Sequence, residues 1–347
     1  MLTGIESPQN GVSDYFDPLP FGTRTVADTL NERGYATAFF GKWHLGKRDP
    51  SAPLVGETHA RMILPLEARG GFGFWEGFEG GFQLNDPWLH GTRLPVPVHI
   101  PGYQSDVLSR RAGDWVSEAD QSRPWFCVVS LEPPHPPYDQ APKEDRSQTS
   151  PLVLPDNVPK GGAAESRARR DLAGYYAHIA ATDRAIGELL SRIDKEDTAI
   201  LFTSVHGDMH GAHGLFRKGW PYEESIRIPL LIHVPKVAAG ARPNAVSLSD
   251  LPAITLSLAD RGILPEFSKA WSRISMPSVV ALPDQCDRMW HGLRTAERKL
   301  VLNQDGSPWL FFDLEQDSLE MNNLVGDKRY VDEIQRWSDC LKAATRL

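Results

Sequence analysis

Residues 34–46 read GYATAFFGKWHLG and set the first expectation about the fold. The run Tyr35–Phe40 is short, largely apolar and followed by a glycine, a pattern that predicts a buried β-strand. A short helix is expected just before it, over Thr25–Arg33, with the next glycine as its stop. The strand leads straight into a polar loop that contains Lys42 and His44. Polar chemistry at the end of a buried strand is typical of open α/β sheets.

Three further apolar runs predict strands of the same kind, and two long helical patterns lie between them. The predicted strands are Trp125–Leu131, Thr198–Ser204 and Pro229–Val234, and the predicted helices are Asp106–Glu118 and Ala164–Ile193. This alternation indicates an α/β fold with a largely parallel sheet sandwiched by helices. The segment 50–104 is rich in glycine, proline and aromatic residues, and we expect it to be a long irregular excursion over the sheet.

The C-terminal part of the sequence has a different pattern. Two apolar runs, Lys299–Asn303 and Trp309–Leu314, flank an Asp-Gly pair and predict a β-hairpin. A final helix is expected over residues 328–344. We therefore predict an α/β domain over residues 1–284 and a small antiparallel α+β subdomain over residues 285–347.

The composition excludes several classes of protein. The chain has 347 residues, 41% of them hydrophobic and 24% charged, and a net charge of −8, which argues against a nucleic-acid partner. No apolar stretch approaches the roughly 20 residues that span a bilayer. Cys127, Cys286 and Cys340 form no CxxC pair, so neither a disulfide framework nor a cysteine zinc site is expected. The first residues lack the features of a signal peptide. The default expectation is the cytoplasm, or the periplasm or secretion if a segment precedes them. The oligomeric state is left open.

Polar loops follow three of the four predicted strands. Their chemistry-bearing residues are, in chain order, Lys42, His44, His135, His206, Asp208 and Lys218. His210 and His213 lie in the same loop as His206 and are expected to be ordinary loop residues. Because the carboxyl ends of parallel strands meet at one edge of a sheet, we expect these side chains to line one pocket. Lysines and histidines with few carboxylates predict a cationic pocket that suits a tetrahedral oxyanion such as sulfate or phosphate. The histidines also raise the alternative of zinc, although the loop contains no HExxH arrangement.

Four stretches resemble the sulfatase family, within the alkaline-phosphatase-like superfamily. GYATAFFGKWHLG (34–46) resembles its second signature, and PPHPPY (133–138) resembles its histidine-bearing loop. TSVHGDMHGAHGLFRKGWPYEESIRIPLLIHVP (203–235) is similar to its metal and substrate segment, and residues 293–324 are similar to its C-terminal subdomain. The resemblance covers nearly the whole chain. It implies hydrolysis of a sulfuric ester, with a small-molecule or carbohydrate sulfate ester as the substrate.

The resemblance also implies roles for single residues. Lys42 and His44 match the residues that hold the catalytic formylglycine and the sulfate. His135 matches the histidine near the leaving oxygen, a candidate proton donor, and Lys218 matches the lysine that grips the sulfate. His206 matches the second member of an Asp-His or Asp-Asn pair that ligates a divalent cation, usually calcium. Asp208 falls outside that pair and is expected beside the site.

Two departures from the family pattern bear on activity. The family's nucleophile lies in a Cys/Ser-x-Pro-x-Arg motif, which occurs nowhere in these 347 residues, and the first residue falls just after the place where it would stand. The family's first strand, with its Asp-Asp metal ligands, is absent as well. Val205 occupies the position of the metal-ligating aspartate, and its isopropyl group offers no oxygen to a hard dication. The chain as written is therefore expected not to turn over sulfate esters.

These observations leave three hypotheses open. The first is an active sulfatase whose start is wrongly assigned, although this does not account for Val205. The second is a non-catalytic pseudosulfatase that binds sulfated ligands through Lys42, His44, His135 and Lys218. The third is a phosphate- or phosphonate-ester hydrolase of the same superfamily, since kinship of fold does not separate these substrates.

Overall fold

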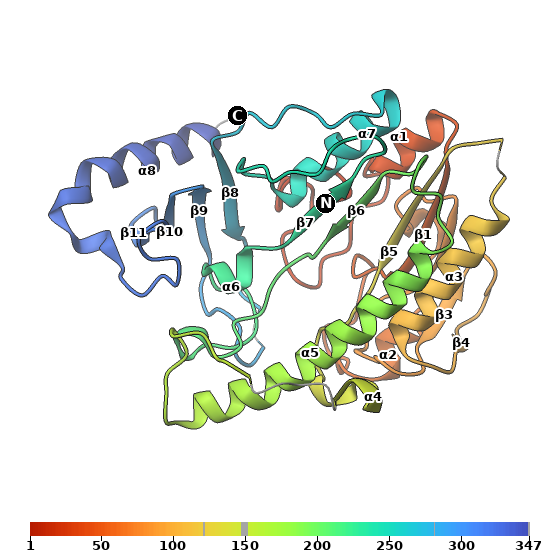
Figure 1. The fold of residues 1–347 in the computed structure, drawn as a ribbon, viewed down its shortest axis with the longest axis horizontal. Helices are drawn as coiled ribbons and strands as arrows, with labels where there is room; N and C mark the ends of the chain where they lie inside the picture. The colour runs from red at the N-terminus through yellow and green to blue at the C-terminus, as the bar shows by residue number, and fades with distance from the viewer. Residues whose placement is uncertain (121, 147–151, 281, 346–347) are drawn as a thin grey trace. The chain divides into compact units, whose positions relative to one another are not determined.

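The computed structural model describes residues 1–120, 122–146, 152–280 and 282–345 (Figure 1). The chain forms two compact units. The first contains Met1–Val12, Phe16–Val153 and Arg169–Ala199, and the second contains Ser13–Tyr15, Leu154–Ala168 and Ile200–Leu347. Among the described residues, no helix has both the length and the apolar character needed to cross a membrane.

The first unit is built on a five-stranded mixed sheet. Its strands are β1 (Ala36–Lys42), β2 (Phe74–Phe78), β3 (Trp88–Gly91), β4 (Val98–His99) and β5 (Trp125–Ser130). Their order is β4-β3-β2-β1-β5, and β1 runs parallel to both of its neighbours. The β2–β3 and β3–β4 pairs are antiparallel. The parallel strands β2, β1 and β5 thus lie together at one end of the sheet. The middle one, β1, is the strand predicted over Tyr35–Phe40.

Helices cover this sheet, as the α/β pattern predicts. They are α1 (Val26–Glu32), α3 (Gln104–Glu118) and α5 (Ala163–Leu190), with the short α2 (Glu57–Ala60) and α4 (Lys143–Arg146) beside them (Figure 1). Side chains of β1 alternate between its faces. Phe40 packs with Ala112 of α3 and Leu189 of α5 on one face. Phe39 is enclosed by aromatic rings on the other face, those of Trp43, Phe72 and Trp75.

Residues 50–104 do not form the irregular excursion predicted from their composition. They contain α2 and the strands β2, β3 and β4, which make up most of the sheet. Two of the glycines that suggested a loop, Gly77 and Gly91, are required by close strand approach. A Cβ on Gly77 would lie 2.2 Å from the carbonyl oxygen of Gly41 on the neighbouring strand. Glycine inside a strand thus marks a tight backbone contact here rather than a break.

In the second unit, β6 (Ile200–Thr203) and β7 (Leu230–His233) form a two-stranded antiparallel sheet. Both strands were predicted, and within the described ranges they pair with each other. The polar loop of the predicted site and the short helix α6 (Glu223–Ile226) lie between them in the chain. The helix α7 (Leu251–Arg261) follows and ends at a left-handed glycine.

The C-terminal part of this unit is a four-stranded antiparallel sheet with the order β11-β10-β9-β8. Its elements are β8 (Trp271–Met276), β9 (Trp290–Thr295), β10 (Arg298–Asn303), β11 (Pro308–Asp313) and the terminal helix α8 (Val331–Thr345). The predicted hairpin and final helix are confirmed, and Leu300 and Phe311 pack against Leu341 of α8. Because β8 begins before residue 285, the sheet starts earlier than expected, and the domain boundary at 284 stays a prediction.

Candidate functional site

Lys42, the last residue of β1, forms an ion pair with Glu132, which lies just beyond the end of β5. The Lys42 Nζ–Glu132 Oε1 distance is 2.5 Å, and the two side chains are 14% and 0% exposed. The pair forms because β1 and β5 are parallel neighbours, with Gly41 opposite Ser130, so that both strands end at the same edge. Glu132 was not predicted from the sequence. Lys42, which was expected in a cationic pocket, is therefore paired with a buried carboxylate.

The side chain of Gln104 fixes Glu132 in place. Gln104 is the first residue of α3 and is fully buried. Its Nε2 donates to Glu132 Oε2 at 3.2 Å, and the backbone N–H of Glu132 donates to Gln104 Oε1 at 3.0 Å. The same Nε2 donates to the carbonyl of Gln83 at 3.0 Å. The carboxylate is thus held by one cation and one neutral amide.

An aromatic ring links Lys42 to His135. The Lys42 ammonium lies 4.6 Å from the ring centroid of Phe82, a cation–π contact. Phe82 stacks on His135, with ring centroids 4.6 Å apart and an interplanar angle of 14°. Phe82 holds a left-handed backbone conformation, φ 54°, which is strained for a non-glycine residue. We call Lys42, Phe82, Gln104, Glu132 and His135 the Lys42 cluster.

His135 is oriented by its own loop. Its Nδ1 donates to the carbonyl of Pro136 at 2.9 Å, and its backbone N–H donates to the carbonyl of Glu132 at 3.0 Å. The second bond makes the loop turn directly after the strand, so the backbone of His135 lies next to that of Glu132. The structure therefore places the predicted proton donor in the same cluster as Lys42.

The loop that carries His44 is anchored by a buried acid, Glu79. His44 is half-buried and lies in a left-handed turn with φ 60°. Glu79 Oε2 accepts the backbone N–H of Gly46 at 3.0 Å, and its Oε1 lies 3.3 Å from Arg48 Nε. Burial raises the pKa of Glu79 to about 8, against the opposing effect of Gly46 and Arg48. Glu79, which was also not predicted from the sequence, fixes the shape of this loop.

The remaining predicted site residues lie in the second unit. Val205 follows the end of β6 and is 60% exposed. The Nδ1 of His206 donates to the carbonyl of Gly207 at 2.8 Å. Lys218 is half-buried. Since Lys42, His44 and His135 belong to the first unit, the single pocket expected for all five cationic residues stays a prediction.

Asp208 closes the loop of the second unit on itself. Its Oδ1 accepts the backbone N–H groups of His210 at 3.2 Å and Arg217 at 3.1 Å. The carboxylate also lies 3.8 Å from the Arg217 guanidinium. These contacts bring the two ends of the loop together, which gives Asp208 a structural role beside the predicted metal position.

The loop packs tightly against α6. The N–H of Gly207 donates to the carbonyl of Ser225 at 2.8 Å, and a Cβ on Gly207 would lie 1.9 Å from the Glu224 carbonyl oxygen. Glycine is therefore required at this position. The His213 ring stacks on Tyr222 with centroids 4.1 Å apart, and burial lowers its pKa. His213 is thus a packing residue, in keeping with its treatment as an ordinary part of the loop.

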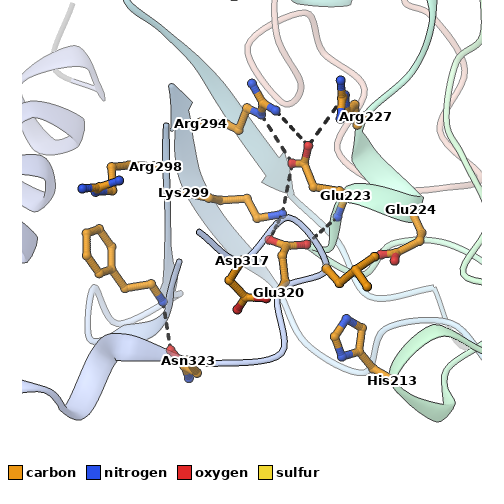
Figure 2. A network of polar contacts seen from close by, with 12 residues as sticks. His213, Glu223, Glu224, Arg227, Arg294, Arg298, Lys299, Asp317, Glu320 and Asn323 are labelled. Atoms are coloured by element: carbon orange, nitrogen blue, oxygen red, sulfur yellow. Dashed lines mark hydrogen bonds and ion pairs between the residues drawn. The ribbon is translucent and has the colours of Figure 1, made fainter. Parts of the chain in front are cut away.

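A buried network joins α6 to the four-stranded sheet (Figure 2). The fully buried Lys299 pairs with Glu320 and lies 3.3 Å from Glu223, which also accepts from Arg294 at 2.9 Å. The N–H of Glu223 donates to Glu320 at 2.7 Å. Burial raises the pKa of Glu320 to about 7. Burial opposes ionisation of Glu223 too, but Lys299 and Arg294 together hold its pKa below the usual value. We call these four residues the Lys299 network.

The residues at the implied metal position do not fit calcium. Calcium takes six to eight oxygen ligands, whereas Val205 offers an alkyl group and His206 an imidazole. Across the described part of the chain, no group of three or more His, Cys, Asp or Glu side chains could hold a metal ion. Sulfatases generally use a divalent cation, so this position departs from the family pattern. No chemical step is therefore derived through a metal.

Comparisons with known proteins agree with the observed fold. The Sulfatase family model matches residues 1–261. The chain is 30% identical to the ulvan-active sulfatase of Formosa agariphila over 343 residues, which cover 90% of this chain and 64% of that protein. The yidJ protein of Bacteroides fragilis superposes with a TM-score of 0.86 at 23% identity, covering 99% of this chain and 83% of the other. A structure solved with its substrate D-glucosamine-2-N,6-O-disulfate gives a TM-score of 0.79 at 21% identity, covering 99% and 86%.

Proposed function

Because this chain belongs to the sulfatase family, we propose that it recognises sulfate esters through the Lys42 cluster of its first unit. The observation that supports this proposal is that Lys42 and His135 both contact the ring of Phe82. An ammonium has three donors, of which one is directed to Glu132. Charged donors of this kind make the strongest hydrogen bonds to oxyanions.

We propose a sulfated carbohydrate as the ligand class. The relatives support this choice, since one acts on ulvan by its name and one was solved with a disulfated glucosamine as its substrate. Phe82 is half-buried and adds an apolar ring beside Lys42 and His135. A sugar ring carrying a sulfate group presents a C–H surface and an anion side by side, which matches that combination of aromatic face and donors.

Hydrolysis is the reaction expected of the family, and His135 is the residue of this chain proposed to protonate the leaving alcohol. The 347 residues contain no Cys/Ser-x-Pro-x-Arg motif, and Val205 stands where the metal-ligating aspartate is expected. We therefore propose recognition without turnover for this chain alone. Turnover is proposed only for a protein that joins these residues to a formylglycine segment and a complete metal site.

Isothermal titration calorimetry with glucosamine 6-sulfate and with unsulfated glucosamine tests this function. We expect binding of the sulfated sugar only, weakened about tenfold or more in Lys42→Ala because a charged hydrogen bond contributes roughly 1.5–3 kcal/mol. Lys47→Ala, an exposed lysine of the same loop, is the matched control and should bind as the wild type does. Lys218→Ala tests whether the lysine of the second unit contributes to the same affinity.

Two results would contradict the proposal. The absence of binding by any sulfated sugar would remove sulfate recognition altogether. Binding of a phosphonate monoester more tightly than the sulfate ester would favour the phosphate- or phosphonate-ester alternative instead.

A further inference from the structure

The carboxylate of Glu132 lies directly beside the ammonium to which we assign sulfate binding. Its side chain is 0% exposed, and its Oε1 is 2.5 Å from Lys42 Nζ. A buried carboxylate does not help a site to bind anions, because its negative charge repels the ligand. Glu132 therefore calls for an explanation beyond the proposed recognition of sulfate.

Few groups are available to compensate the Glu132 charge. Lys42 faces it from β1, and the neutral amide of Gln104 faces it from α3. His135 lies in the same loop and contacts Glu132 through its backbone N–H. Glu79, which follows β2, interacts electrostatically with Lys42. Within the described residues, Lys42 is the one cation that pairs with Glu132.

A bound sulfate changes this balance of charge. Its negative charge would approach Lys42 within a few ångströms of Glu132, so two anionic groups would share a single ammonium. Like charges at such a site favour the neutral form of one partner, and burial strengthens the effect. Sulfate stays ionised, so Glu132 is the partner that can accept a proton.

We propose that anion binding at Lys42 is coupled to the uptake of one proton by Glu132. The inference rests on the proposed sulfate recognition and specifies how it is regulated by pH. One proton moves from the solvent to Glu132 Oε1 as the Lys42 N–H that it accepted turns to the anion. The new O–H of Glu132 then donates to an anion oxygen, while Oε2 keeps its hydrogen bond from Gln104.

This coupling makes the site selective and pH-dependent. The neutral carboxyl is a donor, so Lys42 and Glu132 together present only N–H and O–H groups to the ligand. An anion whose oxygens all accept hydrogen bonds fits this arrangement. By linkage, the uptake of one proton lowers the association constant by up to about tenfold per unit rise in pH.

Calorimetric titration of the whole chain with inorganic sulfate tests the coupling. The binding enthalpy is measured near neutral pH in buffers of different ionisation enthalpy, and its slope against that enthalpy counts the protons taken up. We expect close to one proton per sulfate in the wild type. Affinity should fall as the pH is raised from about 6 to about 8.

Glu132→Gln is the matched variant, because an amide resembles the neutral carboxyl in shape and can donate to the anion. We expect its proton uptake to be close to zero, its affinity nearly independent of pH, and its binding at about pH 8 to be tighter than that of the wild type. Glu57→Gln makes the same chemical change at an exposed helix position and should titrate like the wild type.

The outcomes separate this inference from the proposed function. Sulfate binding by the wild type without proton uptake would overturn the coupling and leave recognition intact. Uptake that persists in Glu132→Gln would assign the proton to another group, such as Glu79 or His135, and would also overturn it. No binding by either protein at any pH would remove both proposals, whereas binding by Glu132→Gln alone would show that Glu132 repels the anion without taking up a proton and would overturn the coupling. The wild-type slope remains decisive if the variant does not fold.

Discussion

At the scale of single residues, Glu79 shows how the loop around His44 is maintained at the expense of stability. Its carboxyl is buried, and it holds the backbone of Gly46 and the side chain of Arg48. Its pKa of about 8 lies above the ordinary value of 4.5. Between these values the folded chain binds more protons at Glu79 than the unfolded chain does. The stabilising contribution of protonated Glu79 is therefore complete below the lower value and is lost as the pH rises through the upper one.

Glu79→Gln should weaken the pH dependence of stability. We expect the free energy of unfolding of the variant minus that of the wild type to increase as the pH rises from about 5 to about 8. The increase should be at most about 1.4 kcal/mol per pH unit. Urea denaturation at several pH values measures this difference. Glu320 titrates in both proteins, so its effect cancels in the comparison. Parallel pH profiles for the two proteins would contradict the role of Glu79.

Val205 leads to a prediction about calcium. A protein with a calcium site is stabilised by RT ln(1 + c/Kd), where c is the free calcium concentration, and this term grows as c exceeds the dissociation constant Kd. Because Val205 and His206 offer no carboxylate, we expect the melting temperature of this chain to shift by less than about 1 °C between millimolar calcium and a chelator. Val205→Asp should increase any calcium-dependent shift. A rise of several degrees in the wild type would show that the chain holds calcium with ligands elsewhere.

At the scale of elements, the Lys299 network attaches α6, and with it the end of the predicted site loop, to the C-terminal sheet. Lys299 lies on β10 and Arg294 on β9, whereas Glu223 begins α6. A buried ion pair adds little net stability, but the loss of one partner leaves an uncompensated charge. The network therefore specifies where α6 lies more than it adds to the total stability.

Lys299→Met should destabilise the chain by about 3–5 kcal/mol, because Glu320 and Glu223 would lose their shared cation. The loss should be larger at about pH 8 than at about pH 5.5, since protonation relieves Glu320 at the lower pH. Chemical denaturation at both values checks the direction. Adding Glu320→Gln to the variant should recover part of the loss, and a loss below about 1 kcal/mol at the higher pH would contradict the assignment.

At the scale of the whole molecule, the sequence predicted the strands that are short, apolar and flanked by breaks: β1, β5, β6 and β7. It missed β2 and β3, whose glycines are required by close strand contact and resemble loop residues, and it missed β4, which has only two residues. Lys42, His44 and His135 were identified from the polar loops that follow two predicted strands, and the family resemblance assigned them roles. Glu132, the partner of Lys42, was not identified, because ninety positions separate the two residues and they meet only through the register of β1 and β5. Pairing across parallel strands leaves no local pattern in the chain.

The β6–β7 pair predicts self-association. Phe202 and Leu231 are register partners on one face of this two-stranded sheet and are 42% and 65% exposed. Exposed apolar strands with open edges are templates for pairing with another chain. We expect the weight-average mass in analytical ultracentrifugation to rise with concentration, and Leu231→Lys to reduce this rise. Val96→Lys, at another exposed apolar residue, is the control for added charge and should reduce it less.

The side chain of Gln104 has a consequence for how ligand binding would be observed. It joins the first turn of α3 to the backbone of Gln83 and to both the backbone and the carboxylate of Glu132. A ligand that settles Glu132 into one protonation state therefore also restrains three segments that are distant in the chain. In hydrogen–deuterium exchange, slower amide exchange should spread from Glu132 to the start of α3 and to the residues around Gln83. Through Gln104, the bound anion would thus slow amide exchange in backbone segments that do not contact it.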